Sequence, residues 1–170
     1  MSKGRPRRRA NTACVAVAAA TLLSCLAAAR WAEGNLRSDT LAFPGFDLRL
    51  SFNPGVAFGI AGGVPSGALI VLVSCILAAV GFAALTGRLP AIPAALIFGG
   101  GAANIVDRLP DGVVTDYIDL GWWPVFNLPD VAITSGAILL FVMSLRATPP
   151  RNDGDPVSGP VSISTPRSHP

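Results

Sequence analysis

The sequence predicts a mainly α-helical membrane protein, in which a bundle of four transmembrane helices carries a small extracytoplasmic β-sheet cradle and a disordered C-terminal tail. Of its 170 residues, 51% are hydrophobic and only 14% are charged, whereas charged residues make up about 25% of an ordinary soluble domain. The mean hydropathy is +0.55, and residues 50–106 carry a single charge, Arg88. This length and composition suit one membrane-embedded bundle without a separate soluble module.

The first span is expected over about residues 10–32, directly after a basic stretch at residues 1–9. Positive charges in this position are typical of a cytoplasmic anchor rather than of a nucleic-acid-binding patch. The same pattern also fits a cleaved signal peptide, and residues 22–25 (LLSC) resemble the lipobox of a bacterial lipoprotein. Because further long apolar segments follow, we expect the first helix to be retained.

The region that follows, residues 33–63, is expected to form the β cradle at the membrane surface. Glycine and proline interrupt short runs here, and residues 48–52 alternate between apolar and polar, as a strand does. A second span is predicted over about residues 65–86, which is long enough to cross roughly 30 Å of hydrocarbon.

Two shorter spans are predicted over about residues 91–108 and 130–147. Three consecutive glycines, residues 99–101, lie in the middle of the first of these and indicate close helix packing, because small residues let helices approach each other in lipid. Residues 148–170 are rich in proline, serine and glycine without apolar periodicity. We therefore expect them to form a disordered cytoplasmic tail.

Four crossings from a cytoplasmic N-terminus return the C-terminus to the cytoplasm and leave residues 33–63 and 107–129 outside. Every aspartate before the tail then lies at the outer end of the bundle, whereas Arg88 lies at the cytoplasmic end. Acidic side chains at a membrane boundary are costly and by default indicate a functional site. The sequence thus places its candidate chemistry on the extracytoplasmic side.

The residues that the chain lacks restrict this chemistry. Its one histidine is His169 in the tail, its one lysine is Lys3 in the basic stretch, and its one glutamate is Glu33. A serine or cysteine nucleophile therefore has no suitable base, and the three isolated cysteines do not have metal-binding spacing. A catalyst of this composition must use aspartates, and we expect it to need neither a metal nor another cofactor.

Asp116 and Asp130 flank a loop of thirteen residues that can bring their carboxyl groups together. Two carboxyl groups in close proximity share one proton, so that one can activate water while the other protonates a leaving group. Spacing alone leaves alternatives open. Any of four nearby aspartates could replace one member, and both residues could be solvated loop acids, or a helix N-cap in the case of Asp130.

Other polar residues accompany these aspartates. The adjacent pair Asp107 and Arg108 is expected to form a structural ion pair or to hold an anionic group. Asn53, Asn104 and Asn127 each offer a donor and an acceptor, which suits binding of an extended peptide backbone, although each alone is more often a turn residue or a satisfied polar group.

Four motifs resemble those of the lipoprotein signal peptidases (signal peptidase II). Residues 52–59 (FNPGVAFG) resemble the asparagine-glycine-alanine-phenylalanine motif, and residues 101–108 (GAANIVDR) resemble the glycine-asparagine-x-x-aspartate-arginine motif. Residues 113–119 (VVTDYID) and 126–130 (FNLPD) are similar to the two catalytic stretches of that family. The motifs occur in the family's order over roughly residues 45–140.

This resemblance implies a four-helix aspartic peptidase of the bacterial inner membrane, with both termini in the cytoplasm and its active site outside. Such enzymes cut prolipoproteins just before a diacylglyceryl-modified cysteine. The implied partners are therefore diacylglyceryl-modified prolipoprotein signal peptides and membrane lipids, and no nucleic acid is expected. We expect the enzyme to be a monomer. By position, the implied catalytic residues are Asp116 and Asp130. The implied substrate-binding residues are Asn53, Gly55, Asn104, Asp107, Arg108 and Asn127.

The chain departs from the family at two places. The first helix of the family carries an aspartate-x-x-Ser/Thr-lysine motif, but residues 23–30 contain no acid, and only Arg30 could supply a displaced positive charge. Pro129 stands where alanine is common and restricts the backbone before Asp130. The missing acid keeps open an inactive relative that binds precursors without turnover. A proton relay fits less well, because the span over residues 65–86 contains no acid.

Overall fold

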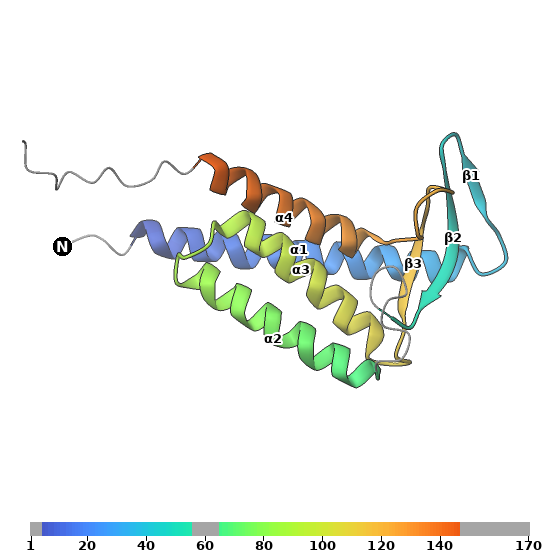
Figure 1. The fold of residues 1–170 in the computed structure, drawn as a ribbon, viewed down its shortest axis with the longest axis horizontal. Helices are drawn as coiled ribbons and strands as arrows, with labels where there is room; N and C mark the ends of the chain where they lie inside the picture. The colour runs from blue at the N-terminus through green and yellow to red at the C-terminus, as the bar shows by residue number, and fades with distance from the viewer. Residues whose placement is uncertain (1–4, 56–64, 147–170) are drawn as a thin grey trace, which may run out of the picture.

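The computed structural model describes residues 5–55 and 65–146, with four helices and a three-stranded sheet at one end of the helical bundle (Figure 1). The helices are α1 (Arg5–Asn35), α2 (Ser66–Leu85), α3 (Ala91–Arg108) and α4 (Leu128–Arg146), and the strands are β1 (Leu41–Phe43), β2 (Phe46–Asn53) and β3 (Val114–Asp119). The expected tail at residues 148–170 lies outside the described residues. A mainly helical fold with a small sheet is therefore confirmed.

Three of the described helices are long and apolar enough to cross a membrane, over Ala10–Asn35, Ser66–Leu85 and Leu128–Arg146. Of the four predicted spans, three are found by this criterion of length and composition, and α3 does not meet it. The glycines in the middle of α3 and its polar end, which includes Asn104 and Asp107, lower its hydropathy.

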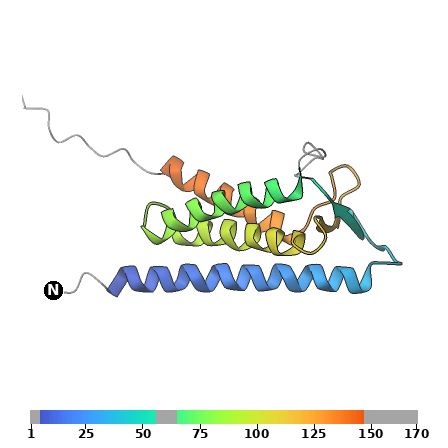
Figure 2. The ribbon, with the colours of Figure 1, turned by 90° about the horizontal axis from the view of Figure 1, so that it is seen from below.

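Helix α3 nevertheless lies at the centre of the bundle, where it contacts α1, α2 and α4, and α1 runs along one side of the layer that the other three form (Figure 2). Its three glycines each meet a different helix. A Cβ atom would come within 2.6 Å of Ala18 O in α1 at Gly99, 2.7 Å of Pro129 O in α4 at Gly100, and 2.7 Å of Leu77 in α2 at Gly101. The close packing predicted from these glycines is confirmed.

The sheet is antiparallel, with strand order β1-β2-β3. The sequence predicts a sheet within residues 33–63, and β1 and β2 lie there, but β3 comes from the connection between α3 and α4. Its pairing with β2 places Ser51 opposite Asp116 and Phe52 opposite Thr115. A strand in this connection is the feature that brings Asp116 beside β2.

The last turns of α1, together with Leu36 directly after the helix, support the sheet. Ala29, Ala32 and Leu36 form a buried cluster with Tyr117 of β3, against which Leu48 of β2 also packs. Burial of this apolar surface is the dominant force that fixes the sheet to the bundle. Because α1 continues to residue 35, beyond the expected end near residue 32, it reaches under the strands rather than stopping short of them.

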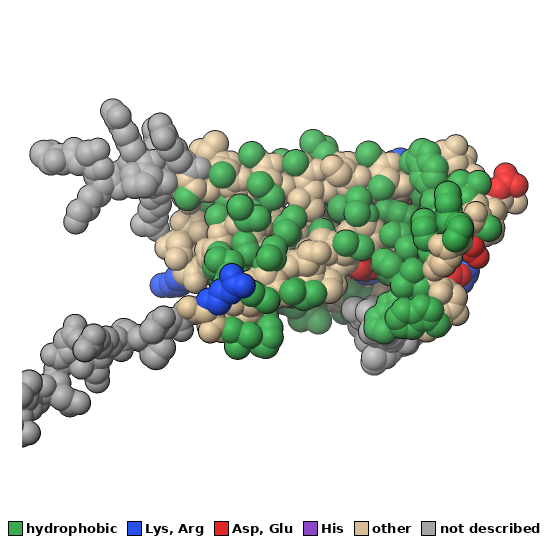
Figure 3. Space-filling model, turned by 90° about the horizontal axis from the view of Figure 1, so that it is seen from above, with side chains coloured by type: hydrophobic (Ala, Val, Ile, Leu, Met, Phe, Trp, Pro, Cys, Tyr) green, Lys and Arg blue, Asp and Glu red, His purple; other side chains and the backbone are tan. Residues whose placement is uncertain are grey.

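Charge is distributed unevenly along the bundle. Figure 3 shows hydrophobic side chains over the helices, with the visible acidic side chains toward the end that carries the sheet. The turn between α2 and α3, which contains Arg88, lies at the opposite end (Figure 1).

Candidate active site

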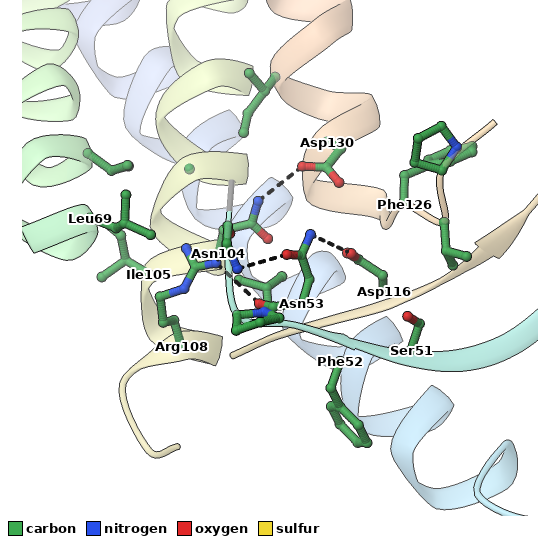
Figure 4. A pocket seen from close by; sticks show the side chains of 18 of the residues that line it. Ser51, Phe52, Asn53, Leu69, Asn104, Ile105, Arg108, Asp116, Phe126 and Asp130 are labelled. Carbon is green, nitrogen blue, oxygen red and sulfur yellow. Dashed lines mark hydrogen bonds between the residues drawn. The ribbon is translucent and has the colours of Figure 1, made fainter. Parts of the chain in front are cut away.

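A cavity of about 770 Å³ lies between the sheet and helices α2, α3 and α4. Figure 4 shows side chains from β2, α3, β3 and α4 around this space. Six of the eight residues that the sequence singles out line it: Asn53, Gly55, Asn104, Arg108, Asp116 and Asp130. The other two, Asp107 and Asn127, are not among the lining residues, but they form hydrogen bonds to Thr115 and Asp116 of β3, respectively.

Asp116 enters the cavity from β3 and is 3% exposed. Its two carboxylate oxygens accept hydrogen bonds from Asn53 Nδ2 at 3.1 Å and from Asn127 Nδ2 at 2.8 Å. Burial raises the pKa of Asp116 to about 7, against the opposing effect of the Asn53 hydrogen bond, because the charged form is poorly solvated. Asp116 therefore exchanges its proton near neutral pH, which suits acid-base chemistry.

Asp130 lies in the first turn of α4 and uses its two oxygens differently. Its Oδ2 accepts from the backbone N–H of Asn127 at 3.3 Å, and the Asp130 N–H donates to Asn127 Oδ1 at 2.9 Å. This is the reciprocal arrangement of a capping box, so that Asn127, and not Asp130, caps the helix. The other oxygen of Asp130 accepts from Asn104 Nδ2 at 3.2 Å (Figure 4).

Asn127 thus contacts both aspartates. Its side-chain oxygen and backbone N–H bind Asp130, and its Nδ2 donates to Asp116. The residue is only 1% exposed, so this arrangement is shielded from water. One buried asparagine therefore fixes the two carboxyl groups relative to each other at the cavity wall.

Arg108 binds the end of β2 rather than a neighbouring carboxylate. Its Nη2 donates to Gly55 O at 2.5 Å and approaches Asn53 O at 3.4 Å, and Gly55 N–H donates to Asn53 Oδ1 at 2.9 Å. The Arg108 Nε is buried and has no hydrogen-bond partner among the described residues. An unpaired buried donor is costly, and this one belongs to a side chain that lines the cavity.

The predicted ion pair between Asp107 and Arg108 is absent from the described part of the chain, in which the ion pairs are Arg30 with Glu33 and Arg49 with Asp119. Asp107 instead accepts the backbone N–H of Thr115 through Oδ2 at 2.6 Å. Adjacent residues of a helix point about 100° apart, so Asp107 reaches β3 while Arg108 reaches β2.

The sequence reasoning missed two residues that support the site. Thr115, which is 3% exposed, precedes Asp116 and binds Asp107 and Glu33. Tyr117 accepts the Leu128 N–H at 3.1 Å, and burial raises its pKa to about 12, so that it remains protonated. The available signal was that both residues are sequence neighbours of Asp116. A strand was not predicted here, because the aspartates of this stretch interrupt the apolar pattern by which a strand is recognised.

The described residues contain no group of three or more histidine, cysteine, aspartate or glutamate side chains that could hold a metal ion. The cavity instead presents two carboxyl groups, two asparagine amides and one arginine. Such a set can share a proton, activate a water molecule and bind the carbonyl and N–H groups of a peptide.

Comparison with known proteins gives a consistent result. Residues 13–146 match the family model described as signal peptidase (SPase) II. The chain is 39% identical over 113 residues to a lipoprotein signal peptidase of Syntrophomonas wolfei, covering 64% of this chain and 74% of that protein. It is 40% identical over 111 residues to a lipoprotein signal peptidase of Rhodococcus jostii, covering 61% and 56% of the respective chains.

A solved structure titled as a bacterial membrane enzyme superimposes with a TM-score of 0.74 at 22% sequence identity. The match covers 85% of this chain and 94% of that one. At this identity the likeness concerns the fold alone.

Proposed function

Because the chain belongs to the signal peptidase II family, a family of membrane proteases, we propose that it removes signal peptides from bacterial prolipoproteins just before the diacylglyceryl-modified cysteine. In this proposal Asp116 and Asp130 form the catalytic dyad. The observation that carries it is the contact of both carboxyl groups with Asn127 at the wall of one cavity.

The dyad works through one shared proton. The ionised carboxylate takes a proton from a water molecule, which attacks the carbonyl carbon of the scissile peptide bond, and the protonated carboxyl group then donates to the leaving nitrogen. Because its pKa is about 7, Asp116 can both hold and release a proton at neutral pH. The aspartates alone supply this acid-base chemistry, so the reaction proposed here uses no metal or other cofactor.

The cavity suits a lipidated peptide. Apolar side chains of α2 and α4, among them Leu69, Val73 and Ile133, line one part of it, and acyl chains can lie against them because both surfaces are then kept away from water. Asn53, Asn104 and Arg108 line the polar part, where their donors can bind an extended backbone. Gly55 allows close approach of the peptide. Asp107 and Asn127 do not line the cavity but hold residues of the site in place, Asp107 through Thr115 and Asn127 through both aspartates.

We also propose how the protein lies in the membrane, starting from the three helices that are long and apolar enough to cross it. We place α3 in the bilayer as a fourth crossing, because it packs against all three other helices. The faces of α1, α2 and α4 that contact α3 would have no packing partner without it. The end that carries the acids and the sheet then lies outside the cytoplasmic membrane, and Arg88 and both termini lie in the cytoplasm, in agreement with the positive-inside rule. We keep the monomer that the sequence predicts, because the described residues of one chain include both aspartates and the asparagines and arginine proposed to bind the peptide.

The test is processing of a diacylglyceryl-modified precursor, followed by its shift on a gel. Wild-type protein is expected to cut the precursor, whereas Asp116→Asn and Asp130→Asn, each present in the membrane at wild-type amount, are expected to leave it intact. Asp39→Asn is the matched control, because Asp39 is an exposed aspartate that does not line the cavity. Cleavage that survives either dyad substitution contradicts the assignment, and wild-type binding without cleavage supports the inactive relative instead.

A further inference from the structure

The last turn of α1 reaches the strand that carries Asp116. The Thr115 hydroxyl donates to Glu33 Oε1 at 3.2 Å, across 82 positions of sequence. Glu33 is the only glutamate of the chain, and its other oxygen accepts from Arg30 Nη1 at 3.0 Å. A carboxylate from α1 therefore contacts the residue next to the proposed catalytic aspartate.

Thr115 is held from three directions. Its N–H donates to Asp107 on α3 at 2.6 Å, its carbonyl oxygen lies 3.4 Å from Nδ2 of Asn127 before α4, and its hydroxyl binds Glu33 on α1. At 3% exposure it has little access to water that could replace a lost partner. Any shift of this residue moves Asp116, because the two are joined by one peptide bond.

Helix α1 contacts β3 in two ways, through an apolar cluster and through the hydrogen bond between Glu33 and Thr115. The apolar cluster between α1 and the sheet, which includes Ala32 and Tyr117, presses the strand onto the helix but is non-directional. A hydrogen bond has a preferred distance and angle. The bond between Glu33 and Thr115 therefore fixes the position of the strand along the axis of α1 and its orientation around that axis.

We propose that Glu33 is a positioning residue for the peptidase reaction, because its hydrogen bond to Thr115 fixes the strand from which Asp116 enters the cavity. This inference rests on the proposed function. It also gives α1 a polar role at the site of a chain whose first helix has no acid over residues 23–30.

The experiment compares variants that remove this hydrogen bond with variants that keep it. Glu33→Met keeps the length of the side chain and its helix propensity but loses the acceptor, and Thr115→Val keeps the shape but loses the hydroxyl. Glu33→Gln and Thr115→Ser retain an acceptor and a donor, respectively. Arg30→Gln is the control, because it removes only an exposed ion pair, which contributes little.

We expect Glu33→Met and Thr115→Val each to lower kcat for a lipidated precursor by roughly 10- to 100-fold, the size of effect that a misplacement of about 1 Å produces, with KM nearly unchanged. The double variant is expected to be no slower than the slower single variant, because both remove the same bond. Glu33→Gln, Thr115→Ser and Arg30→Gln are expected to retain wild-type kcat within about threefold. Recovery in Glu33→Gln would show that the acceptor matters and the charge does not.

Three results would overturn the inference: wild-type kcat in Glu33→Met, a change in KM alone, or effects that multiply in the double variant. If Thr115→Val fails to accumulate in the membrane, the comparison of Glu33→Met with Glu33→Gln decides by itself. Wild-type protein that leaves the precursor intact contradicts the proposed function, and this inference with it. Cleavage by the wild type and by Glu33→Met alike contradicts only the inference.

Discussion

Asn127 and Asp130 bind each other at the start of α4, through the Asp130 N–H to Asn127 Oδ1 at 2.9 Å and the Asn127 N–H to Asp130 Oδ2 at 3.3 Å. The same Asn127 side chain donates to Asp116 at 2.8 Å. The contact that begins the helix therefore also sets the position of Asp116 relative to Asp130.

These two roles of Asn127 can be separated by substitution. Asn127→Ser keeps an effective N-cap residue but is too short to donate to Asp116, whereas Asn127→Ala loses both contacts. We expect both variants to lose precursor cleavage at least 100-fold, and only the alanine variant to lose about 1 to 2 kcal/mol of stability from the missing cap. Thermal unfolding in detergent and the cleavage assay measure the two effects. Equal stability of the two variants would contradict a capping role for Asn127.

Ionisation of Asp116 opposes folding, because burial raises its pKa to about 7 in the folded protein from 3.8. A group whose pKa is raised on folding contributes stability below its unfolded pKa and loses that contribution as the pH rises through its folded pKa. Asp116→Asn is therefore expected to be more stable than wild type above pH 7, by on the order of a few kcal/mol, and to gain little near pH 4. Unfolding temperatures of both proteins across this range provide the measurement. Asp39→Asn, at an exposed position, should show no such trend.

Gly100 is expected not to tolerate a side chain, because a Cβ atom there would lie 2.7 Å from the backbone oxygen of Pro129. Gly100→Ala must push α3 away from α4 near Asn104, one turn further along the same face of α3. We expect a loss of about 1 to 3 kcal/mol from overpacking, together with reduced cleavage. Gly67→Ala is the control, since nothing lies within 4 Å of a Cβ atom at that position. Equal behaviour of the two variants in unfolding and cleavage assays would contradict this account of the α3–α4 contact.

Arg108 is expected to require its guanidinium group. Its Nη2 contacts the carbonyl oxygens of Asn53 and Gly55, and a lysine at this position offers a point charge without the planar fork. Arg108→Lys should therefore lower kcat/KM by at least tenfold, as measured with the lipidated precursor. Arg49→Lys is the matched control, because Arg49 forms an exposed ion pair with Asp119, and such pairs contribute little.

Much of the site could be predicted from the sequence because its residues lie in short motifs. Asn53 and Gly55 occur together before α2, and Asn104 and Arg108 occur together at the end of α3, so each pair stays together in any fold. The partners of these residues could not be predicted in the same way. The expected pairing of Asp107 with Arg108 was wrong because the helix directs the two side chains toward different strands.

The sequence by itself determined that this is a helical membrane protein whose acids gather at one end, because hydropathy and charge are properties of local segments. It also determined which asparagines, aspartates and arginine were candidates. Only the tertiary structure decided that α3 is a central helix although its composition is not that of a span, that β3 joins the sheet, and that Glu33 contacts Thr115. These features depend on contacts between segments tens of residues apart, and the backbone geometry that creates such contacts is not encoded in any single segment.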